Sequence, residues 1–167
     1  MNTRSTNSLP IVTYSLIGLC VLIFFGVEAT RLPQAGLLAL YLPANPNFHV
    51  WQYLTSMFMH GSISHLFFNM LALWMFGAGL ERLWGGPRFL IFYLLCGIGA
   101  GLIYNGVTSY ELHSLAQQLQ SGRVAGLQSE YNAIYNSASL GASGAIYGIL
   151  VAFAFCFPNT KLVFIFL

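Results

Sequence analysis

Ten charged residues are all that this chain of 167 carries, and long charge-free intervals separate them. They make up 6% of the sequence, against roughly 25% in an average soluble protein. With 57% hydrophobic residues, the chain has too few charges to solvate the surface of a water-soluble domain. The apolar content also excludes a disordered chain, and a net charge of +2 excludes a nucleic-acid partner. We therefore expect an all-helical, multi-pass membrane protein.

One helical crossing of a bilayer needs about 20 mostly apolar residues. The charge-free intervals are long enough for four such crossings. The first of them follows a basic residue, as the core of a secretory signal peptide would. However, no small-x-small cleavage site precedes Glu28 and further crossings follow, so a retained helix is the preferred interpretation. The predicted crossings are about 10–28, 57–80, 89–109 and 140–158.

The segments between and after the crossings have a different character. Residues 32–56 contain several prolines and are predicted to form a non-spanning loop near the membrane interface. Residues 111–137 are rich in glutamine and are predicted to form an extramembrane loop with some helix. A fifth apolar run begins at about 161 and reaches only Leu167. We therefore expect residues 1–167 to form an incomplete membrane domain, with four complete transmembrane helices and the start of a fifth.

The placement of Lys and Arg predicts how the helices are oriented. With alternating crossings, one side of the membrane has four of the six basic residues and the other has two. Because the cytoplasmic side carries the excess, the N-terminus is predicted to be cytoplasmic, with 28–56 and 111–137 outside. The cytoplasmic residues are Arg4, Arg82, Arg88 and Lys161, and the outer ones are Arg31 and Arg123.

Two predicted crossings carry polar residues near their outer ends, where burial in lipid is costly and usually reflects a function. In the second crossing, His65 and Asn69 are four residues apart and share a helix face, and His60 precedes them. The fourth crossing has Ser143 in its first turn and Tyr147 one turn further on the same face. The predicted topology brings both groups to a similar depth.

The surroundings of Ser143 suit a nucleophile beside an oxyanion hole. The first turn of a helix has free backbone N–H groups and a positive dipole end, and Gly141 and Gly144 allow another backbone to approach closely. An Asn amide and a His ring on a facing helix can supply further donors. The alternatives are structural. Gly144 and Gly148 form a GxxxG packing pair in which Ser143 is simply small, and the His–Asn pair can be an interhelical hydrogen bond.

Neither a metal nor another cofactor is expected. None of the four histidines belongs to an HExxH motif, and the chain contains no Asp. The three cysteines lie inside apolar runs without CxxC spacing, so they are interpreted as small core residues.

These residues resemble the rhomboid family of intramembrane serine proteases. Gly141-Ala142-Ser143-Gly144 is similar to the family's GxSG motif. His65-Leu66-Phe67-Phe68-Asn69 is similar to the HxxxN pattern of its second helix, which His60 precedes. Tyr147, four residues after the serine, also fits the pattern. Glu81-Arg82-Leu83-Trp84-Gly85 resembles the turn at the cytoplasmic end of the second helix.

The resemblance covers roughly residues 50 to 158 and implies a six-helix core that cleaves transmembrane segments of other proteins. By that resemblance, Ser143 is the nucleophile, and its backbone N–H forms the oxyanion hole with His65 and Asn69. Four residues have supporting roles by the same resemblance: Gly141 and Gly144 of the motif, Tyr147, which would position the catalytic histidine, and His60, which would form hydrogen bonds.

The chain departs from the family pattern in two places. Trp51-Gln52 stands where a Trp-Arg pair is common, which is a mild change. The family's general base is a histidine on the sixth helix, and no histidine follows Ser143 here. Without a base, the serine stays a protonated hydroxyl and a poor nucleophile. We expect this chain to be inactive as it stands and truncated from a full-length protein that is active.

The expected partners are membrane lipids and single-pass transmembrane protein substrates, in a bacterial cytoplasmic (inner) membrane. No feature of the sequence indicates an oligomeric state. The main alternative is a non-catalytic rhomboid-like protein that binds transmembrane clients, which predicts no sixth-helix histidine in the remaining sequence. A transporter or channel would need ionisable residues at mid-membrane depth, whereas Glu, Lys and Arg here all lie at the ends of the crossings.

Overall fold

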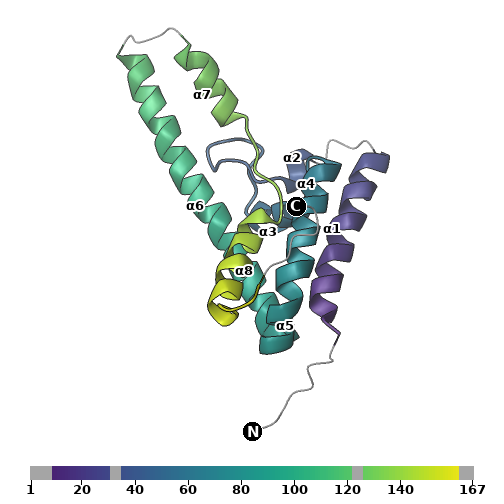
Figure 1. Ribbon diagram of the computed structural model, residues 1–167. Helices are drawn as coiled ribbons and strands as arrows, with labels where there is room; N and C mark the ends of the chain where they lie inside the picture. The colour runs from purple at the N-terminus through teal and green to yellow at the C-terminus, as the bar shows by residue number, and fades with distance from the viewer. Residues whose placement is uncertain (1–8, 31–34, 122–125, 162–167) are drawn as a thin grey trace.

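The computed structural model describes residues 9–30, 35–121 and 126–161, most of which are helical. These residues form no strand, although an isolated antiparallel bridge joins Leu40 to Ser139. Figure 1 shows α1, α4, α5 and α8 grouped together, with the upper part of α6 and α7 extending away from them. The elements are α1 (Ile11–Thr30), α2 (Ala35–Leu38), α3 (Gln52–Thr55), the 3₁₀ helix η1 (Ser56–Phe58), α4 (Ile63–Ala72), the π-helix η2 (Leu73–Gly77), α5 (Ala78–Trp84), α6 (Gly86–Gln120), α7 (Leu127–Tyr135) and α8 (Ser143–Cys156).

Three helical stretches of the described chain are long and apolar enough to cross a membrane: Ile11–Ala29, Ile63–Trp84 and Gly86–Gln120. The second of these is the continuous helix made by α4, η2 and α5, and α8 is a shorter apolar helix of 14 residues. The predicted fold class, an all-helical polytopic membrane bundle, is confirmed. The predicted fifth apolar run after Lys161 and the basic residues Arg4, Arg31 and Arg123 lie outside the described residues.

The helix of the second predicted crossing, about 57–80, begins later than expected. Ser56–Phe58 form the separate 3₁₀ helix η1, and the continuous helix begins at Ile63. Ser62 explains the difference, because its backbone is extended and its Oγ accepts a hydrogen bond from the N–H of His65 at 3.1 Å. The charge-free interval marks an apolar segment, but the capping serine decides where the helix starts.

The helix of the third predicted crossing, about 89–109, continues to Gln120. Its 35 residues correspond to about 52 Å at 1.5 Å per residue, which exceeds the roughly 30 Å of a hydrocarbon core. Leu112 and Leu115 of the extension are buried, and α7 packs against α6. The described part of 111–137 is therefore mostly helical. Polar residues show where a membrane would end, but they do not stop the helix.

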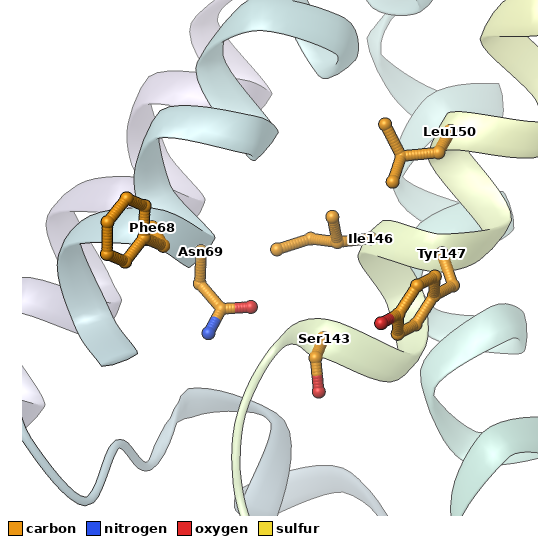
Figure 2. A pocket seen from close by; sticks show the side chains of 6 residues that line it. All are labelled: Phe68, Asn69, Ser143, Ile146, Tyr147 and Leu150. Carbon is orange, nitrogen blue, oxygen red and sulfur yellow. The ribbon is translucent and has the colours of Figure 1, made fainter. Parts of the chain in front are cut away.

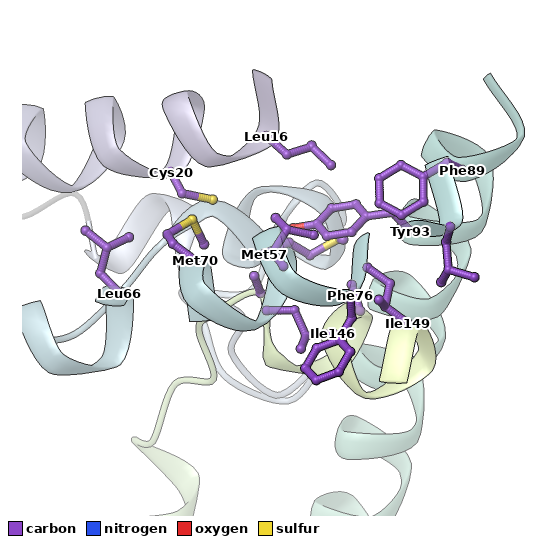
Figure 3. Close-up of a cluster of buried hydrophobic side chains, with 14 of the residues drawn as sticks. Leu16, Cys20, Met57, Leu66, Met70, Phe76, Phe89, Tyr93, Ile146 and Ile149 are labelled. Atoms are coloured by element: carbon purple, nitrogen blue, oxygen red, sulfur yellow. The ribbon is translucent and has the colours of Figure 1, made fainter. Parts of the chain in front are cut away.

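The core lies where α1, the continuous α4–α5 helix, α6 and α8 meet (Figure 3). α6 packs along α8, and α1 packs against η2. Because lipid tails are as apolar as these side chains, close packing rather than expulsion of water holds such helices together. The labelled members of the cluster include Leu16, Cys20, Phe76, Phe89, Tyr93, Ile146 and Ile149.

Glycines allow α6 and α8 to approach each other closely, which gives a first prediction. A Cβ at Gly148 would lie 2.8 Å from the Cβ of Cys96 and closer still to its sulfur. Gly148→Ala is expected to lower the free energy of unfolding by about 1–3 kcal/mol, because the helices must move apart. Gly99→Ala is the control. Its new Cβ would meet nothing within 4 Å, so we expect a gain of up to about 1 kcal/mol from better helix propensity. Denaturation in mixed micelles measures both, and equal effects would contradict the packing role.

Glu81 anchors the start of α1. Its buried carboxylate accepts hydrogen bonds from the N–H of Val12 at 2.9 Å and from the N–H and hydroxyl of Thr13, both at 2.7 Å. The first N–H groups of a helix lack partners within the helix, and the positive end of the helix dipole favours an anion there. The carboxylate therefore joins the beginning of α1 to α5.

Removal of this carboxylate should weaken the bundle. Glu81→Ala leaves the N–H groups of Val12 and Thr13 without acceptors in a buried site, so we expect a loss of about 2–4 kcal/mol in the free energy of unfolding. Glu81→Gln keeps one acceptor oxygen and should lose less. Glu130→Ala, at an exposed position on α7, should change stability by less than about 0.5 kcal/mol. If Glu81→Ala matched this control, the anchoring role would be wrong.

Gln52 organises the loop before η1. Its Oε1 accepts hydrogen bonds from the N–H of Tyr41 at 3.2 Å and of His49 at 3.1 Å. Its Nε2 donates to the carbonyls of Gly36 at 3.2 Å and Asn47 at 2.8 Å. The side chain is fully buried, and these four bonds satisfy it completely. The glutamine that departs from the common Trp-Arg pair thus holds together backbone groups from across the loop.

Candidate active site

Ser143 is the first residue of α8. The N–H groups of a helix's first turn have no acceptors within the helix, so the hydroxyl stands among free donors. Two residues earlier, Gly141 has a φ of 123°, in the region that favours glycine. The chain therefore makes a sharp turn into α8, and the serine lies at the end of that turn.

Backbone hydrogen bonds fix this turn against distant parts of the chain. The N–H of Gly141 donates to the carbonyl of Ser56 at 2.9 Å. Leu40 and Ser139 exchange two hydrogen bonds of 2.8 Å each. Ser56 was not predicted from the sequence, because it contributes a main-chain carbonyl, which no pattern of side chains indicates. The position of Ser143 thus depends on η1 and on the loop that Gln52 organises.

His65 lies directly against Gly141. A Cβ at Gly141 would be 2.8 Å from both Cε1 and Nε2 of His65, and 3.8 Å from the Oγ of Ser143. The imidazole and the hydroxyl, which come from different helices, therefore approach the same point on the backbone. Only a glycine leaves room for the ring there. The contact brings the His65 ring of α4 against the turn that leads into α8.

Asn69 and Ser143 line one cavity of about 190 Å³ between α4 and α8. Figure 2 shows the Asn69 amide and the Ser143 hydroxyl on facing walls, with the ring of Tyr147 beside the serine. The Asn69 Nδ2 donates to the carbonyl of His65 at 2.8 Å. An amide nitrogen carries two hydrogens, so the second is available to a group in the cavity. The other lining residues are Phe68, Ile146 and Leu150.

His60 supports His65 through ring contact. The two ring centroids are 5.1 Å apart, with the rings edge to face. His60 is buried, and neither of its ring nitrogens has a hydrogen-bond partner within the described part of the chain. The structure therefore places His60 beside the site residue, where its contact with His65 is one of packing.

A second, smaller cavity of about 110 Å³ borders Ser143 on the α6 side. Its wall includes Ser56, Tyr104, Ser139 and Gly144. Ser143 therefore has open space on two sides. In the residues that the structure describes, no group of three or more His, Cys, Asp or Glu side chains is placed to hold a metal ion.

The fold and the site together define a polytopic helical membrane protein with a serine at a helix N-terminus, beside a histidine and an asparagine of a facing helix. A family model for the rhomboid domain matches residues 47–167. The chain belongs to the rhomboid family, whose proteases are intramembrane serine proteases. The resemblance stated from the motifs is thereby confirmed.

Individual relatives agree with this family. Rhomboid protease GluP of Bacillus subtilis (strain 168) is 32% identical over 164 residues, which cover 95% of this chain and 27% of the relative. Rhomboid protease AarA of Providencia stuartii is 36% identical over 102 residues, 61% of this chain and 32% of the relative. Rhomboid protease GlpG of Salmonella newport (strain SL254) is 29% identical over 94 residues, which cover 55% of this chain and 34% of the relative. The matched parts amount to between about a quarter and a third of each relative's length.

Proposed function

We propose that the full-length protein is an intramembrane serine endopeptidase that cleaves transmembrane segments of membrane proteins, with Ser143 as its nucleophile. The observation that carries this proposal is the convergence at Gly141, where the His65 ring and the Ser143 hydroxyl approach the same point. Asn69, across the cavity from the serine, adds a further donor. Membership of a family of intramembrane proteases supports the same chemistry.

In the proposed reaction, the Oγ of Ser143 attacks the carbonyl carbon of a peptide bond in the substrate. The new C–O bond forms as the Oγ proton passes to a general base and the carbonyl π electrons move onto oxygen. The resulting oxyanion accepts hydrogen bonds from the Ser143 N–H, the His65 ring and the Asn69 amide. The C–N bond then breaks, the base returns the proton to the leaving amine, and water hydrolyses the acyl-enzyme.

The general base is proposed to come from a segment outside these 167 residues, which include no histidine after Ser143. His65 is assigned to the oxyanion hole, and His60 is packed behind it. We therefore propose that this chain alone does not cleave. The loss of one member of a nucleophile–base unit lowers the rate by roughly 10⁴- to 10⁶-fold.

The membrane setting is part of the proposal. We propose that α1, the continuous α4–α5 helix, α6 and α8 each cross the membrane, with a cytoplasmic N-terminus. The excess of basic residues at the proposed cytoplasmic side supports this orientation. The proposed substrates are single-pass transmembrane proteins, and the proposed location is a bacterial cytoplasmic membrane. The relatives from Bacillus, Providencia and Salmonella support a bacterial source.

The direct test is cleavage of a single-pass transmembrane substrate in liposomes, with products identified by mass spectrometry. The full-length protein is expected to release two fragments cut within or beside the transmembrane segment. The 167-residue chain is expected to release none. Binding of the substrate by the full-length protein without cleavage would favour a client-binding protein and would overturn the protease assignment.

A further inference from the structure

A groove lies between α1 and the continuous α4–α5 helix. It has a volume of about 330 Å³ and is lined by Tyr14, Trp74, Met75, Ala78 and Arg82. The wall of the groove is apolar or aromatic except for the guanidinium. Tyr14 is 45% exposed and Trp74 is 51% exposed, so both rings face the surroundings of the bundle rather than its core.

Arg82 also borders a second cavity, of about 330 Å³, at the end of the bundle where α1 begins and α5 ends. In the part of the chain that the structure describes, no ion pair or hydrogen bond engages the Arg82 side chain. The adjacent carboxylate of Glu81 is directed to Val12 and Thr13 instead. Arg82 is thus an exposed cation that borders two open cavities.

Two charged side chains line this second cavity, the exposed guanidinium of Arg82 and the buried carboxylate of Glu81. The first residues of α1 and of α6, Ile11 and Gly86, both line it. The Glu81 carboxylate already compensates the positive end of α1 through the hydrogen bonds that it accepts from Val12 and Thr13. Arg82 is therefore the charge of this cavity that has no partner in the described residues. The polar end of a ligand therefore has room beside Arg82, and its apolar part can continue into the groove between the helices.

We propose that this groove binds an anionic phospholipid, with its phosphate on Arg82 and one acyl chain between Tyr14 and Trp74. A guanidinium presents paired donors that match phosphate oxygens. Basic pockets between transmembrane helices are known to bind lipid headgroups, and Tyr and Trp suit the boundary between headgroup and acyl chain. The guanidinium at one end of the groove complements a phosphate, and the apolar wall along the rest of the groove suits an acyl chain.

The test is thermal unfolding of the full-length protein in detergent during titration with phosphatidylglycerol. The lipid is expected to raise the Tm of the wild type. Arg82→Gln should need about tenfold more lipid to reach half of that shift, because it loses one charge-assisted contact. The lipid concentration that Arg82→Lys needs should lie between those of the wild type and Arg82→Gln. Arg88→Gln is the matched control, because it removes the same charge from the first turn of α6 and lies in neither cavity. An unchanged response in Arg82→Gln, or an equal loss in Arg88→Gln, would overturn the site.

Two further titrations define the ligand. Phosphatidylcholine with the same chains and free glycerol phosphate are both expected to give little shift. An equal shift with phosphatidylcholine would contradict headgroup selection, and an equal shift with glycerol phosphate would contradict a lipid. To locate the acyl chain, brominated phosphatidylglycerol should quench Trp74 in a full-length variant in which every other tryptophan, Trp51 and Trp84 included, is replaced by Phe. Quenching that persists undiminished after Arg82→Gln would count against the proposed binding pose.

Discussion

Ser143→Ala is expected to abolish cleavage of a single-pass transmembrane substrate by the full-length protein, a fall in rate of roughly 10⁴- to 10⁶-fold. The reason is chemical, because alanine has no atom that can form the acyl-enzyme bond. The hydroxyl is half-buried at the first turn of α8, and within residues 9–30, 35–121 and 126–161 it forms no hydrogen bond that the fold requires. We therefore expect the loss of rate to come without a comparable loss of stability, measured as the Tm of the purified variant.

The matched control for this substitution is Ser129→Ala, which makes the same change at an exposed position on α7. It should leave the cleavage rate within about twofold, as substitutions far from a site normally do. Retention of more than a hundredth of the wild-type rate by Ser143→Ala would show that another residue is the nucleophile. An equal loss in both variants would point to damage of the fold.

Gly141→Ala has the second largest expected effect. The backbone φ of 123° disfavours any side chain, and the new Cβ would lie 2.8 Å from the His65 ring. The ring, the turn or both must move, and displacement of a catalytic group by about 1 Å can cost roughly 100-fold in rate. We expect kcat/KM to fall by at least about 100-fold in the same liposome assay.

A double-mutant cycle separates the two causes. If Gly141→Ala acts by displacing the imidazole, the pair Gly141→Ala with His65→Ala should be little worse than His65→Ala alone, because the clash partner has gone. If the strained turn is responsible, the two effects should multiply. Gly99→Ala, in open space on α6, controls for a glycine-to-alanine change in the membrane domain. Gly141→Ala with activity within threefold of the wild type would contradict the tight approach of His65.

The sequence indicates candidate side chains for the site, because polar residues are unusual in a membrane segment. Ser143, His65 and Asn69 are polar within predicted crossings, where burial in lipid is costly, and the alternation of the crossings predicts that they lie at a similar depth. The helix ends were harder to predict. Ser62 caps α4 five residues after the start of the predicted crossing, and α6 continues past its apolar part to Gln120. Local capping and packing against α7 decide these ends, and neither follows from the distribution of charge.

Other parts of the site left no signal in the sequence. The carbonyl of Ser56 fixes the turn at Gly141 through the main chain, and any residue type supplies a carbonyl. Glu81 was visible as part of a motif, but its hydrogen bonds to Thr13 join residues 68 positions apart. Contacts of this kind depend on how α1 docks against α5, which is a property of the packed bundle.

Ser143 is proposed to be an activated nucleophile in the full-length protein, and covalent labelling detects such activation. A fluorophosphonate forms a P–O bond with an activated serine and releases fluoride, so the adduct can be mapped by peptide mass spectrometry. We predict a single major adduct on Ser143 that disappears in Ser143→Ala and is strongly reduced in His65→Ala. An adduct on a different serine, or substrate cleavage by a protein whose Ser143 forms no adduct, would show that Ser143 is not the nucleophile.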